Sequence, residues 1–326
     1  MENKEADKSR MDELFTFDEN QCIGEKEKEN FKRAKRKSTL KMVTISGLVL
    51  VVVIVLSCVL KMQITPYLVH DDIGQKENYY RIYGANSYLS VWEESYQLIG
   101  SEASSIQYRL IEGIPVYEGR LTLKSSEVKP SISGGNDTDW QKNQYEETYY
   151  LSGNKAMQFF APELEYPTYM NDFSMLKNMG TEKRAELAIS FDRDYTVKEI
   201  EKMLPHDVHL VWNWVKPVKE ENRKETLKYV YLGDEISGFP MNDKVGNPLK
   251  DPVENFKENL RIATREGGEN KREFTEMYEQ LGGETMSEKT VKISGIVVTG
   301  SPKDLAGLEG KSFVKGASLG AVVDQY

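Results

Sequence analysis

Residues 42–60 read MVTISGLVLVVVIVLSCVL and contain no Asp, Glu, Lys or Arg. At about 1.5 Å of rise per residue, a helix of this length spans roughly the 30 Å hydrocarbon core of a bilayer. Only a helix satisfies every backbone polar group of a single span in lipid, so the many β-branched residues do not indicate a strand. The stretch therefore predicts one transmembrane helix that divides the chain between two compartments.

Charges on either side of this stretch predict its orientation. Residues 31–41 carry six basic groups and no acidic group, whereas only Lys61 follows the apolar run directly. This asymmetry predicts a cytoplasmic N-terminus and an extracytoplasmic position for residues 61–326. A cleaved signal peptide is disfavoured, because the apolar run starts late, is too long and lacks a small-residue cleavage site after it. We expect a single-pass protein of the cell membrane.

The composition of the chain limits the kinds of partner it can bind and indicates the kind of organism it comes from. Residues 61–326 hold 32 basic and 42 acidic groups, a net charge of −10, which disfavours direct nucleic-acid binding. The two cysteines, Cys22 and Cys58, lie in the N-terminal arm and the apolar run. An exported part of this size without cysteine cannot form disulfides and is typical of bacterial envelope proteins, in particular Gram-positive ones.

The arm, residues 1–41, is mostly polar but contains one group of apolar side chains. The candidate partner-binding residues are Leu14, Phe15, Phe17 and Ile23. The group is too short to hold a helix alone. Two interpretations stay open: a solvated tail, or a docking segment that folds on a cytoplasmic partner.

The next region, 61–179, is predicted to be β-rich. Four aromatic or β-branched stretches are separated by Gly, Asn and Pro: Tyr79–Tyr83, Ser87–Trp92, Tyr108–Ile111 and Val116–Leu123. The polar, turn-rich segment Ser125–Asn143 predicts a long surface loop.

From residue 180 to 326 helices alternate with strands. Glu186–Phe191 predicts a strand, Thr196 and Glu199 form a capping-box pattern that starts a helix, and Pro205 ends it. Val208–Val215 predicts the returning strand.

The same order recurs at the C-terminus. Val291–Thr299 predicts a strand, Ser301 an N-cap, and Ser318–Asp324 a last strand. Between the two units, helices are expected over 251–265 and Asn270–Leu281, with a break at Gly267 and Gly268. The predicted fold class is α+β: one transmembrane helix, a β-rich membrane-proximal region, and a C-terminal domain of two β-α-β units, ferredoxin-like, with inserted helices.

Sequence motifs for catalysis or metal binding are weak. Gly316–Gly320 (GASLG) matches the serine-hydrolase elbow, but the following helix and the downstream His that this site needs are missing. His206 and His209 lack a third His or Cys for a zinc site. The sequence predicts neither an enzyme nor a bound metal or cofactor. Trp212 and Trp214 share one strand face, which indicates either core packing or an exported ligand face.

Four stretches resemble the sigma factor regulators of Gram-positive bacteria, which are membrane-bound anti-sigma factors of extracytoplasmic-function sigma factors. They are ELAISFDRDYTVKEIEKMLPHDVHLVWNWV (186–215), GFP (238–240), KISGIVVTGSPKDLAGL (292–308) and GASLGAVVDQY (316–326). The basic cluster, the apolar run and the β-rich segment after it resemble the family's N-terminal module.

The resemblance implies different functions for the arm and for the exported domain. The arm would sequester an extracytoplasmic-function sigma factor, and the exported domain would sense or relay the state of the envelope. The arm has no His and one Cys, so it cannot carry the His-Cys-Cys zinc motif of redox-type anti-sigma factors. It is also short for wrapping a whole sigma factor, and a second small membrane protein could share that task. The alternative is a membrane-anchored extracytoplasmic binding module with an inert tail.

Overall fold

The computed structural model describes residues 24–96, 101–126, 129–133, 147–150, 152–215 and 229–325. The chain divides into two units, Met1–Ile64 and Thr65–Tyr326. The candidate partner-binding side chains Leu14, Phe15, Phe17 and Ile23 lie outside the described residues.

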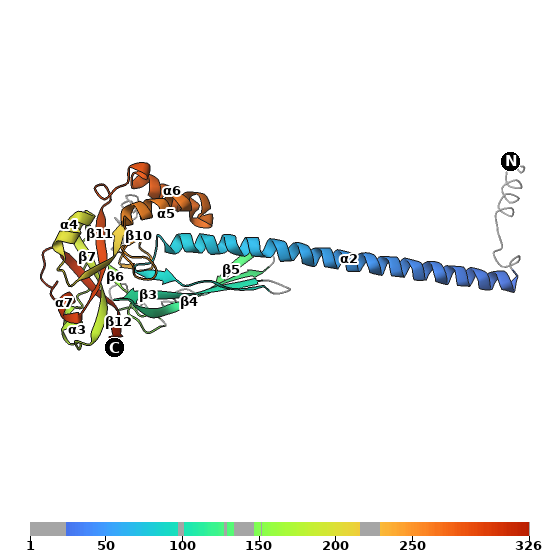
Figure 1. Cartoon of the computed structure of the whole chain (residues 1–326), viewed down its shortest axis with the longest axis horizontal. Helices are drawn as coiled ribbons and strands as arrows, with labels where there is room; N and C mark the ends of the chain where they lie inside the picture. Colours follow the sequence, from blue (N-terminus) through green and yellow to red (C-terminus); the bar gives the residue numbers. More distant parts are fainter. Residues whose placement is uncertain are drawn as a thin grey trace, which may run out of the picture. The chain divides into compact units, whose positions relative to one another are not determined.

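The first described element is one long helix, α2 (Glu25–Tyr80), drawn in blue in Figure 1. It contains the predicted span, 42–60, and it is the one helix in the described part of the chain that is long and apolar enough to cross a membrane. Apolar side chains of the span, such as Val49 and Leu56, are exposed in the structure. The helix runs 20 residues past the predicted end and includes Pro66.

This extension corrects the first predicted strand, Tyr79–Tyr83. Tyr79 and Tyr80 belong to α2, and Arg81 lies in the turn that follows. The aromatic composition favoured a strand, but Tyr79 and Tyr83 stack with ring centroids 4.8 Å apart, and their spacing of four residues suits a helix and its first turn. Tertiary packing decides here over intrinsic preference.

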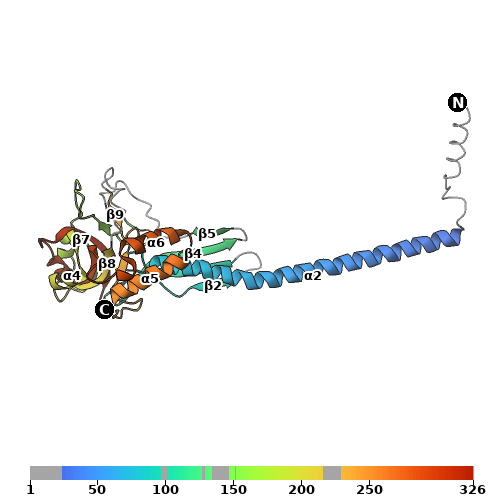
Figure 2. The same ribbon diagram turned by 90° about the horizontal axis from the view of Figure 1, so that it is seen from above.

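A sheet follows in the order β1-β3-β4-β5, with β2 also paired to β3. Its strands β2, β4 and β5 are labelled in Figure 2. Its strands are β1 (Ser87–Leu89), β2 (Glu93–Tyr96), β3 (Ser101–Ile111), β4 (Ile114–Ser126) and β5 (Lys129–Ser133). The predicted strands around Ser87, Tyr108 and Val116 are confirmed.

The predicted loop Ser125–Asn143 is corrected in its first part. Ser125 and Ser126 extend β4, and Lys129–Ser133 form β5, because backbone pairing runs from Ser126↔Lys129 to Thr122↔Ser133. Residues 134–143 lie outside the described part.

A second sheet of five strands has the order β10-β8-β11-β7-β12, and all its neighbouring strands are antiparallel. The elements from here to the C-terminus are β6 (Gln158–Phe159), α3 (Phe173–Lys177), β7 (Lys183–Tyr195), α4 (Val197–Met203), β8 (His209–Val215), β9 (Tyr231–Leu232), β10 (Gly238–Pro240), α5 (Pro252–Glu266), α6 (Lys271–Gln280), β11 (Ile293–Gly300), α7 (Pro302–Ala306) and β12 (Val314–Asp324). Short 3₁₀ turns lie at Gly268–Asn270 and Gly283–Thr285.

Both predicted strand-helix-strand units are present, and each is split by a strand of the other. β7 and β8 are parallel with β11 between them, and β11 and β12 are parallel with β7 between them. Helix α4 starts at the predicted capping box, in which the amide of Glu199 donates to Thr196 and the Glu199 carboxylate accepts from the amide of Thr196. Helix α7 begins after the predicted Ser301 cap. The inserted helices are α5 and α6, as expected.

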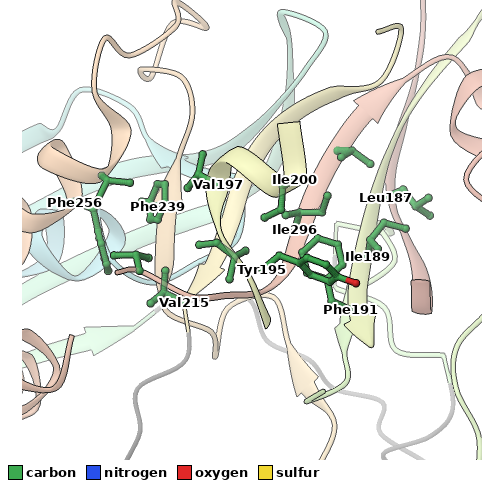
Figure 3. Packing of buried hydrophobic residues seen from close by; sticks show 14 of the residues in the cluster. Leu187, Ile189, Phe191, Tyr195, Val197, Ile200, Val215, Phe239, Phe256 and Ile296 are labelled. Atoms are coloured by element: carbon green, nitrogen blue, oxygen red, sulfur yellow. The ribbon is translucent and has the colours of Figure 1, made fainter. Parts of the chain in front are cut away.

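One face of this sheet carries the main apolar core (Figure 3). Leu187, Ile189 and Phe191 point to it from alternate positions of β7, as the two-residue period of a strand requires. Ile200 of α4 and Phe256 of α5 pack against them. This face is called the apolar face below.

The other face is partly polar and lies against the irregular segment 156–161, which contains β6; we call it the polar face. Its glycines give that segment room: a Cβ at Gly316 would stand 2.8 Å from the Phe160 ring, and one at Gly295 3.4 Å from Phe159. The hydroxyls of Ser190 and Ser318 accept hydrogen bonds from the backbone amides of Phe160 and Gln158, at 2.9 and 3.0 Å.

Candidate functional site

The last turns of α2 are built into the second unit. Val69 and Ile73, one turn apart, are buried with Ala103 of β3 and Leu123 of β4, and Trp92 packs beside them. Side chains four residues apart cover one stripe of a helix, so this stripe is fixed on the first sheet. The end of α2 therefore has a defined seat on β3 and β4.

The end of α2 and the residues after it also contact α6 and the turn before that helix. Tyr83, just after α2, lies 6.3 Å from Phe274 of α6 between ring centroids, and its hydroxyl donates to Glu273. Gly268 has φ +54°, and a Cβ there would collide with Gln75 of α2. Glycine at this position permits the close approach of α2.

The chain that leaves α2 joins the second sheet directly. Ile82 is part of the main core, and its carbonyl accepts a hydrogen bond of 2.7 Å from the amide of Gly238 in β10. Tyr83 forms a bridge with Ser237, and the amide of Ala85 donates to Gly233. These bonds connect the end of α2 directly to the edge of this sheet.

A buried ion cluster joins the two sheets. Arg109 of β3 donates from Nε to Glu118 of β4 at 2.7 Å and from Nη1 to Glu186 of β7 at 2.9 Å. Ser87 and Gln107 donate to Glu118, and Asn86 donates to Glu186. The three charged side chains are 2% exposed or less. We call Arg109, Glu118 and Glu186 the interior triad.

The interior triad has two carboxylates and one guanidinium, so it carries a net charge of −1 when all three are ionised. Burial disfavours the charge on Arg109, but Glu118 and Glu186 outweigh burial and raise the pKa of Arg109 well above its ordinary value. Nearby, burial raises the pKa of Asp234 to about 6. Arg109 is therefore held as a cation inside the protein, and breaking its pairs would leave buried carboxylates uncompensated.

A second buried pair anchors β12. Lys155 donates to Asp172 at 2.6 Å, and the Asp172 carboxylate also accepts from the amide of Leu319 at 2.7 Å. Both charged side chains are almost fully buried. At the end of β11, a partly exposed carboxylate, that of Glu112, accepts from the hydroxyl of Thr299 at 2.5 Å. Carboxylates thus fix β12 and β11 to segments outside the sheet.

A surface depression of about 370 Å³ opens beside the end of α2. It is lined by Tyr80 and Arg81 from the helix end, by Asn242 after β10, and by Asn255 and Asn259 of α5. A second depression, of about 470 Å³, adjoins it and shares Asn86, Tyr88 and Asn242 as lining residues.

Trp212 and Trp214 lie on one face of β8, as the two-residue period of a strand predicts. Trp214 is 1% and Trp212 3% exposed, and both belong to the apolar cluster on the polar face. Trp214 packs edge-to-face on Phe159 at 5.6 Å between centroids. Trp212 also lines the first depression, so only this indole borders an open surface. A ligand role of the pair stays a prediction.

The motifs without a predicted function have structural roles. Ser318 lies within β12, is fully buried and satisfies a backbone amide, so it is not presented as a nucleophile. His206 is exposed in a turn, and His209 contacts Glu112 at 2.9 Å. Among the described residues, no group of three or more His, Cys, Asp or Glu is arranged to hold a metal ion.

Sequence reasoning missed the interior triad. Glu186 is a visible signal, because it begins the apolar run of β7 and a lone carboxylate there requires a partner. Arg109 and Glu118 give no comparable signal, since each alternates with apolar residues as in any half-exposed strand. The pairing of Arg109 with Glu186 spans 77 residues of chain and depends on how two sheets meet.

Comparison with known proteins identifies the second sheet. Residues 176–321 match the family model described as sigma factor regulator C-terminal. No curated protein and no solved structure matches the chain. The match runs from β7 into β12, where it ends at residue 321, and includes Glu186 of the interior triad, while Arg109, Glu118 and the end of α2 lie outside it. Residues 176–321 are therefore a sigma factor regulator C-terminal domain.

Proposed function

We propose that this protein is a membrane-anchored anti-sigma factor. Its cytoplasmic arm would sequester an extracytoplasmic-function sigma factor, and its extracytoplasmic part would sense or relay the state of the envelope. The family match at 176–321, in a chain whose α2 is long and apolar enough to cross a membrane, is the observation that carries the proposal. The basic residues 31–41 favour a cytoplasmic N-terminus.

The contacts of α2 support a relay. Its last turns pack on β3 and β4, and the residues that follow them hydrogen-bond to β10. A change in the second unit that moves these contacts would act on the same helix that contains the span. A ligand of the second unit could shift α2 between two arrangements only by the difference between its binding free energies to them.

We infer that the arm binds its partner through apolar burial and acidic charge. Phe15, Phe17 and Ile23 would supply the buried area, and Asp12, Glu13, Asp18 and Glu19 would face basic surface of the sigma factor. Whether a second small membrane protein contributes is answered by what co-purifies with the chain. The protein would act by binding rather than by catalysis.

The sheet order adds a proposal about fold type. With β7, β8, β11 and β12 numbered one to four, the order across the sheet is 2-3-1-4, which read from the other edge is 4-1-3-2. Two split strand-helix-strand units in this order support a ferredoxin-like core to which β10 is added.

The test uses the full chain in bacterial cells with a sigma-dependent reporter. Substituting Phe15, Phe17 and Ile23 by Ser should raise reporter activity and abolish co-purification of the sigma factor. A control with Lys8, Asn20 and Gln21 changed to Ser keeps the arm's length and should behave as wild type. Unchanged reporter activity and no co-purifying sigma factor with either chain would favour the binding module with an inert tail.

A further inference from the structure

The depression beside the end of α2 has the chemistry of a ligand site. Its apolar lining includes Tyr80, Tyr88, Trp212 and Leu249, and carboxamides from four asparagines add polar groups. Sites for small molecules combine an apolar lining with a few convergent polar groups in this way. We propose that the depression binds a neutral saccharide.

The charges around the depression give no net attraction for an ionic ligand. Glu77 and Arg81 pair with each other at 3.2 Å. The Asp243 carboxylate accepts hydrogen bonds from the amides of Val245 and Asn247, and Lys244 balances its charge. Two acidic and two basic side chains thus line the depression, so neither an anion nor a cation gains from a net field.

The asparagines offer donors and acceptors side by side. Asn259 Nδ2 donates to Asn255 Oδ1 at 3.0 Å, which leaves the Asn255 amide nitrogen and the Asn259 carbonyl oxygen for a ligand. The side chain of Asn242 adds a third carboxamide to this lining. Neighbouring hydroxyls of a sugar ring both donate and accept, so they match such a pair, and the C–H face of the ring matches an aromatic wall.

The second depression adjoins the first, so we expect a ligand long enough to extend over both. The two depressions, of about 370 and 470 Å³, share Asn86, Tyr88 and Asn242. Asn86 is buried, and its Oδ1 has no hydrogen-bond partner within the described part of the chain. A ligand of several sugar rings would lie across both depressions and pass over Asn86.

The position of the site deepens the proposed function, on which this regulatory role rests. Glu77 and Tyr80 come from the last turn of α2, and Asn255 and Asn259 come from α5. A saccharide between these elements would favour the arrangement of α2 that it contacts best, and it would thereby supply the stimulus for the relay.

The test is a calorimetric titration of the full chain in lipid nanodiscs with the tetrasaccharide of N-acetylglucosamine. Saturable binding is expected. The double variant Asn255→Ala and Asn259→Ala should bind about tenfold more weakly, since it removes hydrogen bonds to the ligand. The matched control Asn178→Ala replaces an exposed asparagine outside both depressions and should bind as wild type.

Absence of saturable binding to the wild-type chain, or equal affinity of the double variant and wild type, would overturn the proposal. So would competition by the uncapped dipeptide Ala-Ala, which would identify a peptide site instead. Thermal unfolding of each variant checks that the fold is intact. The titration contains no sigma factor, so a negative reporter test of the arm leaves its outcome unaffected.

Discussion

The two faces of the second sheet achieve burial by different means. The apolar face is closed by aliphatic and aromatic side chains of β7, α4 and α5, such as Ile189, Ile200 and Phe256. The polar face is buried as completely, yet it holds Glu186, Ser190 and Ser318. The apolar face makes a core that lies mostly within the family domain, with Ile82 added from outside it, whereas the polar face joins that domain to the rest of the second unit through the interior triad.

This difference has a physical consequence. Apolar contacts are non-directional and tolerate small shifts, while buried charges require particular partners. The interior triad therefore fixes how β3 and β4 meet β7, in addition to any contribution to stability. Because buried ion pairs repay their desolvation poorly, we infer that the triad contributes to the specificity of the fold more than to its stability.

The largest effect is expected from breaking the polar face. Arg109→Met would leave Glu118 and Glu186 buried without their cation, and we expect a loss of roughly 3–5 kcal/mol of unfolding free energy. Urea denaturation of the full chain in detergent micelles measures it. Combining Arg109→Met with Glu118→Gln and Glu186→Gln should recover much of the loss. If the single variant is as stable as wild type, the charges are not held as the structure has them.

On the apolar face, Ile189→Ala should cost roughly 2–5 kcal/mol, because it leaves a cavity in a fully buried cluster. The same denaturation experiment measures it. A conservative Ile189→Val change should cost about 1 kcal/mol, and a graded response of this kind is characteristic of an apolar core. The triad should instead respond to the pairing of charges, and equal behaviour of the two faces would refute the comparison.

A buried carboxyl group, that of Asp234, makes the stability of the protein depend on pH, which apolar burial does not. Burial raises the pKa of Asp234 from 3.8 to about 6, so the folded state binds its proton more tightly than the unfolded state does. Stability from this group is fully present below pH 3.8 and falls as the pH rises to about 6. Asp234→Asn should therefore stabilise the protein at pH 7.5, by at most about 3 kcal/mol, and have little effect near pH 4. Thermal denaturation at both pH values measures this, and a stabilisation that is equal at both would contradict the assignment.

The smallest effect is expected at a local feature on neither buried face. Thr196→Ala removes the hydroxyl that accepts from the Glu199 amide at the start of α4 and should cost about 1 kcal/mol. Thr196→Ser keeps that oxygen and serves as the matched control. A shift in melting temperature that is larger than that of Ile189→Ala would show that the cap has a role beyond α4.

Local signals explain which parts of the fold were predictable. The capping box at Thr196, the Ser301 cap and the break after α5 are each determined by a few neighbouring residues, and the structure confirms all three. The helical extension to Tyr80 was missed, because its evidence is the packing of Val69 and Ile73 on a sheet that comes later in the chain.

The GASLG run is a second feature whose role depends on packing against a distant part of the chain. Gly316–Gly320 resembles a catalytic elbow in sequence, but in β12 its two glycines and Ser318 lie on the polar face, against Glu186 and the segment 156–161. Gly320 allows the approach of Glu186, since a Cβ there would collide with the carboxylate. These small residues, spaced two apart, allow close packing against the segment 156–161. This role can be recognised only when that segment is seen beside β12.

The sequence by itself determined the long apolar span, the strand and helix order of residues 180–326 and the family resemblance, because each depends on local composition, periodicity or capping. Only the tertiary structure decided that Arg109 and Glu118 meet Glu186, that the two strand-helix-strand units interleave, and that asparagines of α5 and the end of α2 border one depression. These features depend on contacts between residues far apart in the chain, whose pairing leaves no local periodic signal.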